Sequence, residues 1–154
     1  MTEDRTPAGI DPRGPRFGAA VTAVLALAVV GLATAGALVA AVSVLAVLAA
    51  AFAAGALGGV QRNPFGILYR VLVQPRLASP AEREDPRPPT FAQRLGLGIT
   101  LAGILGALLA PAPASIAAGS LVFLAAFLNA VFGLCVGCRI HLIISRVRRG
   151  VTAA

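Results

Sequence analysis

The chain has no lysine and no tryptophan, and it contains only two cysteines, one histidine, one tyrosine and one methionine. Charged residues make up 12% of its 154 positions, against roughly a quarter in soluble domains. Two long stretches, residues 17–60 and 91–134, lack Asp, Glu, Lys and His, and their only Arg is Arg94. Hydrophobic residues reach 58%. This composition excludes an ordinary water-soluble domain and indicates a membrane protein.

Each apolar stretch is too long for a single crossing, because a helix at ~1.5 Å per residue would far exceed the ~30 Å hydrocarbon core. Gly31, Thr34 and Gly36 interrupt the first stretch, and Pro111 and Pro113 interrupt the second, so each is expected to turn back. We predict an all-α integral membrane bundle of four transmembrane helices in two hairpins. The expected spans are about 17–35, 38–58, 91–110 and 115–136 of a single membrane domain, residues 17–149.

Polar segments flank these spans. Residues 1–16 carry mixed charges and three prolines, so we expect a disordered cytoplasmic tail, and residues 150–154 form a short second tail. Residues 61–93 form the expected cytoplasmic loop, which contains several prolines. Its apolar piece, residues 67–73, is too short to cross the bilayer. That piece either lies at the level of the lipid headgroups or packs on the domain.

The arginines predict the orientation. Three of the 13 lie in the N-terminal tail, six in the central loop with its flanks and four in the C-terminal segment from Arg139 to Arg149, and none lies in the short turns near Ala35 and Ala112. Because excess Arg stays in the cytoplasm, both termini and the loop should face it, which gives a multi-pass protein of the cell membrane. A cleaved signal peptide ending near Ala35 is the weaker alternative, since it would leave three spans and oppose this distribution. The retention of arginines on the cytoplasmic side, where they attract anionic lipid headgroups, accounts for the net charge of +7. We therefore expect no nucleic-acid partner.

Reactive side chains gather in one segment, residues 129–141. It holds the only two cysteines, Cys135 and Cys138, and the only histidine, His141. Thiol–disulfide or sulfur-transfer chemistry, metal binding and simple packing are the three interpretations of the pair. We expect no metal, because these three residues fall short of the four ligands that structural zinc prefers. No other cofactor is expected, and the reducing cytoplasm argues against a permanent structural disulfide.

Helix geometry sets a condition on the cysteine pair. In a regular helix, residues three apart have Cβ atoms ~5 to 6 Å apart, whereas a disulfide needs ~3.5 to 4.5 Å. Gly133 and Gly137 offer places for an irregularity. If the helix breaks near Gly133, Cys135 begins a new helix, whose N-terminus, together with Arg139, favours a thiolate. If the helix continues, burial keeps the thiols neutral and inert. The sequence leaves both outcomes open.

Two further polar residues belong to this segment. Asn129 lies within the last expected span, where its amide either lines a small cavity leading toward the thiols or makes a hydrogen bond between helices. His141 is expected to be an interfacial residue and not a catalytic base.

Small residues spaced four apart allow helices to approach closely. Such pairs are Gly55 with Gly59 and Gly133 with Gly137. They serve either packing within the bundle, which we favour, or association into a homo-oligomer.

The chain resembles a group of small bacterial membrane proteins, the domain-of-unknown-function family 4395. The matching features are Asp11-Pro12-Arg13 leading to Arg16-Phe17, Arg62-Asn63-Pro64, Pro75-Arg76-Leu77, Glu84-Asp85 followed by Pro88-Pro89, Phe91-Ala92-Gln93, and the segment from Asn129 to Cys138. The resemblance covers nearly the whole chain. It implies a membrane protein that works beside thioredoxin-like or rhodanese-like proteins, and it supplies no activity. Arg139 stands where many members have a polar or acidic residue.

Two functions follow as hypotheses. In the first, the cytoplasm-facing pair exchanges electrons or sulfur with a soluble thioredoxin-like or rhodanese-like protein, and Cys135 is the attacking sulfur. In the second, the protein is a non-enzymatic membrane scaffold, whose Arg-rich loop binds partners and whose cysteines only pack. The first hypothesis would make the chain a redox or sulfur-transfer protein, and the second would make it a non-enzymatic one, so the sequence leaves open whether it is an enzyme.

Overall fold

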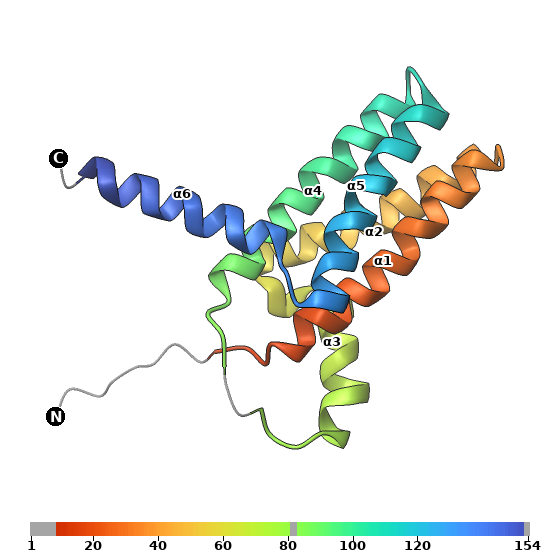
Figure 1. Ribbon diagram of the computed structural model, residues 1–154. Coiled ribbons are helices and arrows are strands. Elements are labelled where there is room, and N and C mark those ends of the chain that lie inside the picture. Colours follow the sequence, from red (N-terminus) through yellow and green to blue (C-terminus); the bar gives the residue numbers. More distant parts are fainter. Residues whose placement is uncertain (1–8, 81–82, 153–154) are drawn as a thin grey trace, which may run out of the picture.

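The computed structural model describes residues 9–80 and 83–152, and in this part of the chain the fold is all-α (Figure 1). Six α-helices follow one another: α1 Arg13–Thr34, α2 Leu38–Gly58, α3 Pro64–Leu68, α4 Arg87–Ala107, α5 Pro111–Phe132 and α6 Val136–Thr152. Three short turns of 3-10 or π-helix connect α2 and α3 to the loop: η1 Val60–Arg62, η2 Tyr69–Val73 and η3 Gln74–Arg76. The one β-bridge of the described residues joins Ile10 and Glu84.

The four long helices α1, α2, α4 and α5 form two antiparallel hairpins, as the sequence predicts. The first hairpin turns at Gly36, whose φ of 80° is a conformation that glycine adopts without a steric penalty. The second turns directly before α5, where Pro111 takes the first helical position and its fixed φ suits the start of a helix. The predicted bounds of the second span, 38–58, coincide with α2.

The two hairpins pack side by side into a bundle. α1 contacts α2 and α5, and α4 contacts α2 and α5, so that the order around the bundle is α1, α2, α4, α5. Val29, Leu45 and Leu48 are fully buried at its centre. Small residues permit the close approach: a Cβ added at Gly119 of α5 would lie 3.1 Å from a methyl group of Val29 on α1.

Three of the described helices, α1, α2 and α5, are long and apolar enough to cross a membrane. Their outward faces carry exposed aliphatic side chains such as Val39, which is 84% exposed. A large apolar exterior of this kind indicates a membrane protein. The expected third span, 91–110, overlaps α4, which begins at Arg87 and carries Gln93 and Arg94 in its first two turns; α4 is not among the three.

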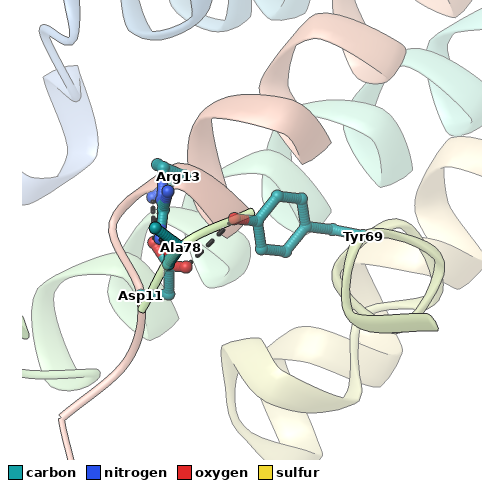
Figure 2. A network of polar contacts seen from close by, with 4 residues as sticks. All are labelled: Asp11, Arg13, Tyr69 and Ala78. Atoms are coloured by element: carbon teal, nitrogen blue, oxygen red, sulfur yellow. Dashed lines mark hydrogen bonds and ion pairs between the residues drawn. The ribbon is translucent and has the colours of Figure 1, made fainter. Parts of the chain in front are cut away.

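The segment before α1 is fixed on the central loop, as Figure 2 shows. Asp11 accepts a hydrogen bond from the hydroxyl group of Tyr69 at 3.0 Å and forms an ion pair with Arg13 at 3.0 Å. The Arg13 guanidinium also donates to the carbonyl of Ala78 at 2.9 Å. Buried Ile10 pairs with Glu84 through two backbone hydrogen bonds.

These contacts correct the expectation of a disordered tail up to residue 16. Residues 9–16 are held by the loop, and α1 begins at Arg13, because Asp11 and Arg13 find partners that only the fold brings near. Residues 1–8 of the expected tail lie outside the described residues. The second expected tail, 150–154, is helical through Thr152, and its last two residues also lie outside the description.

The expected loop 61–93 is largely helical. Asn63 is buried and caps α3, and α4 already begins at Arg87. The apolar piece 67–73 spans the end of α3 and η2, and its Tyr69 packs on Phe17 with ring centroids 5.8 Å apart. Val71 and Leu72 on the same piece are exposed. One face of the piece therefore packs on the domain, as one of the two sequence interpretations has it.

Candidate functional site

The last predicted span does not continue to residue 136, because α5 ends at Phe132. Gly133 follows in the left-handed conformation, with φ of 66°, where a side chain would be strained. The N–H groups of Gly133 and Leu134 donate to the carbonyls of Asn129 and Leu128, both at 3.1 Å, and so close the last turn. The helix therefore breaks at Gly133 and does not continue through the cysteines.

Cys135 occupies the position directly before α6. Its Sγ accepts a hydrogen bond from the backbone N–H of Cys138 at 3.3 Å, and its carbonyl accepts one from the N–H of Arg139 at 3.1 Å. The sulfur thus takes the place of an N-cap side chain. Cys135 and Cys138 are joined as a disulfide, with their Cα atoms 5.2 Å apart. The prediction that the pair needs an irregular backbone is confirmed.

Helix α6 leaves the bundle at an angle, and its first turns lie on α4 (Figure 1). Buried Gly137 contacts Ala92 so closely that an added Cβ would lie 2.6 Å from the Ala92 Cβ. One turn further, His141 packs on Phe91 of α4, with ring centroids 5.3 Å apart. These contacts with α4 fix the cysteine turn against the bundle.

The cysteine turn borders a cavity of about 180 Å³ in the same half of the bundle. The cavity lies among α1, α4 and α5, with Phe52 of α2 at one side, and most of its wall is aliphatic or small. Leu95 and Ile99 of α4 and Val122 and Ala126 of α5 belong to that wall. Along α5 it extends from Asn129 to Val122, which is roughly 10 Å at the rise of an α-helix.

Three amide side chains line this cavity. Buried Asn63 donates from Nδ2 to the Gln93 Oε1 atom at 2.7 Å and to the Ala51 carbonyl at 3.2 Å, while its Oδ1 accepts from the N–H of Phe65 at 2.9 Å. In the described part of the chain, neither the Gln93 Nε2 group nor the Asn129 amide makes a hydrogen bond. Both therefore remain able to bind something in the cavity. For Asn129, this supports the cavity interpretation over the bond between helices.

Arg16 is a residue of the site that the sequence reasoning missed. Its guanidinium lines the cavity, donates to the Val131 carbonyl at 3.5 Å, and lies 3.6 Å from where a Cβ of Gly133 would be. It thus balances the negative end of the α5 dipole beside the cysteine turn. Gln93 and Asn63 were missed as site residues as well. All three look in the sequence like ordinary polar residues next to a span.

The structure gathers most of the predicted site residues and separates two of them. Asn129, Gly133, Cys135, Gly137 and Cys138 all line the cavity. Arg139 is exposed and His141 borders a different hollow, which also involves Arg87 and Arg94. The described residues contain no group of three or more Cys, His, Asp or Glu side chains that could hold a metal ion.

Residues 9–80 and 83–152 thus form an all-α fold with three helices apolar enough to span a bilayer and a Cys-x-x-Cys turn on a cavity. Residues 10–146 match the family described as Domain of unknown function (DUF4395), and the chain belongs to that family. None of the curated proteins and none of the solved structures matches the chain. The resemblance drawn from the sequence is confirmed.

Proposed function

We propose that the protein is a thiol–disulfide or sulfur-relay component of the cell membrane, which acts through Cys135 and Cys138. The observation that carries this proposal is the helix break at Gly133, because it places Cys135 at the N-terminus of α6. There the N–H groups and the helix dipole favour a thiolate, which is the form that attacks disulfides. The same turn holds Cys138 within bonding reach.

In the reduced protein, the Cys135 thiolate attacks a disulfide of a thioredoxin-like partner. One new sulfur–sulfur bond forms to the partner, and the partner's other sulfur leaves as a thiolate. Cys138 then attacks Cys135, which forms the internal disulfide and releases the partner as a dithiol. The reverse sequence oxidises the partner. With a rhodanese-like partner, the Cys135 thiolate instead attacks the outer sulfur of a cysteine persulfide on that partner. The bond between this outer sulfur and the partner's cysteine sulfur breaks, the partner leaves as a thiolate, and Cys135 carries the persulfide.

The proposed topology has four transmembrane helices, α1, α2, α4 and α5, with both termini and the central loop in the cytoplasm. The bundle arrangement supports α4 as the fourth span, because it packs between α2 and α5 along its length. The complete absence of Arg from the turns near Ala35 and Ala112 supports the orientation. A reporter fused after Ala154 should be active in the cytoplasm, and one inserted at Gly36 only outside it. The opposite pattern would overturn this topology.

A membrane scaffold that uses its Arg-rich loop is the competing function. Two of these arginines are engaged within the loop, since Arg70 donates to the backbone carbonyl of Gln61 and Arg76 to that of Leu72. Such arginines are less free to bind a partner, which favours the thiol function.

Trapping a mixed disulfide tests the proposal. The Cys138→Ser variant should leave the Cys135 thiolate unable to release a partner, so that a covalent adduct accumulates in cells and disappears on reduction. The matched Cys135→Ser variant should give much less adduct. Thiols that stay reduced in native membranes, react slowly with alkylating agents and trap no partner would instead support the scaffold.

A further inference from the structure

We propose that the cavity beside the cysteine turn binds the ring of a lipid-soluble quinone, which accepts the electrons that Cys135 and Cys138 collect. This inference rests on the proposed thiol function and names the second substrate of the same site. It starts from the position of the cavity, which has the two cysteines at one end and continues among α1, α4 and α5.

The size of the cavity fits one substituted ring. Its volume is about 180 Å³. An apolar cavity of about 150 Å³ already binds benzene, whereas sites for drug-sized ligands usually have about 300 Å³ or more. A peptide such as glutathione is larger and charged, and it would lose its hydration among these walls. A compact apolar ring is the better occupant.

The polar groups of the cavity fit the oxygen atoms of a quinone. The Asn129 amide and the Nε2 group of Gln93 have no hydrogen-bond partner within the described part of the chain, while the Gln93 Oε1 atom accepts from Asn63. The Arg16 guanidinium lines the same cavity near Gly133. All three can donate to a carbonyl oxygen, while Leu95, Ile99 and Val122 surround the rest of the ring. A ligand whose oxygen atoms accept their hydrogen bonds satisfies these donors.

The redox step balances without another co-reactant. The two thiols of the reduced pair lose two protons and two electrons, and one sulfur–sulfur bond forms. The quinone gains the two electrons and two protons, so that both carbonyl oxygens become hydroxyl groups of a quinol. A soluble dithiol partner then reduces the Cys135–Cys138 disulfide again and leaves as a disulfide. Reducing equivalents pass in this way from a cytoplasmic thiol to the lipid phase.

The experiment uses the full chain in lipid nanodiscs, with the cysteines reduced and the reductant removed. Duroquinone is the probe, because its four methyl groups leave no ring hydrogen where a thiol could add. Quinone absorbance reports its reduction, and mass spectrometry after maleimide labelling counts the free thiols. We expect one quinol per chain, formed as both thiols disappear.

Two variants place the reaction in the cavity. Ala125→Leu fills space in the cavity wall and should slow quinone reduction about tenfold or more, whereas Ala46→Leu on the exposed face of α2 should leave it unchanged. Asn129→Leu removes a donor and should raise the half-saturating quinone concentration about tenfold. If Ala125→Leu does not fold, the Asn129→Leu result decides.

Two results would overturn the inference. In one, the wild-type thiols remain reduced with duroquinone, although an oxidised thioredoxin-like protein oxidises them; the proposed function would then stand without the quinone. In the other, quinone oxidises the wild type and both cavity variants equally, which would place the reaction at the surface. If Cys138→Ser traps no partner although duroquinone oxidises the wild-type thiols in the cavity, the result counts against the soluble partner of the proposed function and leaves the quinone step standing.

Discussion

Gly137 of α6 meets Ala92 of α4 in a contact that leaves no room for a side chain. A Cβ at Gly137 would lie 2.6 Å from the Ala92 Cβ and 2.7 Å from its Cα. This contact, together with the left-handed Gly133, determines where Cys138 lies relative to the cavity. The cysteine turn thus depends on two glycines for two different reasons, close packing and backbone conformation.

The first prediction concerns that contact. Gly137→Val should push α6 away from α4, destabilise the protein by about 1–3 kcal/mol and expose the cysteines, because overpacking forces the backbone to shift. Alkylation of the reduced protein should become several-fold faster. Gly98→Ala is the matched control, since an added Cβ there meets nothing within 4 Å. Equal alkylation rates in Gly137→Val and wild type would contradict the proposed packing role.

The second prediction concerns Asn63, which joins α2, α3 and α4. Asn63→Ala removes its hydrogen bonds to Ala51, Phe65 and Gln93 and should cost about 1–3 kcal/mol of stability, because these buried groups lose their partner. Denaturation in mixed micelles measures the loss. Gln61→Ala, at an exposed position two residues earlier, should change stability little. A similar loss in both variants would refute a specific role of Asn63.

The third prediction concerns pH. Burial by itself raises the pKa of Asp11, but hydrogen bonds from the Arg13 side chain and backbone and from Tyr69 outweigh it and lower the pKa below its ordinary 3.8. The folded state therefore holds the carboxylate more strongly than the unfolded state. The stabilisation by ionised Asp11 is complete at a pH above the pKa that this residue has in the unfolded chain. It is lost as the pH falls through the lower pKa that Asp11 has in the folded state. Thermal melting should show that the difference between wild type and Asp11→Asn is constant near neutral pH and shrinks below about pH 4.

Tyr69 should show the opposite dependence at high pH. Burial, followed by the hydrogen bond to Asp11 and the negative charge of that residue, raises the pKa of Tyr69 above 10.0. The contribution of Tyr69 to folding stability is complete at a pH below the pKa that this residue has in the unfolded chain. It is lost as the pH rises through the higher pKa that Tyr69 has in the folded state. Tyr69→Phe keeps the packing on Phe17 and should cost about 0.5–1.5 kcal/mol at neutral pH. The melting temperature of Tyr69→Phe should also fall less at alkaline pH than that of the wild type, because the variant has no phenol to ionise. An equal fall in both proteins would contradict this role of Tyr69.

The fourth prediction separates two arginines near the cysteines. Both side chains are exposed, but Arg16 lines the cavity together with Cys135 and Arg139 does not. Arg16→Gln should slow alkylation of the reduced pair several-fold at neutral pH, because a cation beside the cysteine turn favours the thiolate. Arg139→Gln should have a smaller effect, since Arg139 lies outside the cavity that the cysteines border. Iodoacetamide rates across pH measure both, and a larger effect of Arg139→Gln would reverse this assignment.

The sequence by itself determined the hairpins. Apolar runs twice the length of a span must turn back, and Gly36 and Pro111 mark where they do, so the predicted second span coincides with α2. The last span was predicted to continue to residue 136, four residues past the end of α5 at Phe132. Hydrophobicity does not change at this point, and a glycine such as Gly133 permits both a continuous helix and a left-handed turn.

Only the tertiary structure decided which polar residues belong to the site. Arg16, Asn63 and Gln93 lie far from the cysteines in the chain, and each looks like a residue that faces the headgroups. The packing of α1, α3, α4 and α5 brings them to one cavity and leaves Arg139 and His141 outside it. Whether a segment enters the lipid depends on its local composition, which can be read directly from the sequence. Convergence on a cavity depends on helix rotation and crossing, which are set by contacts between distant side chains.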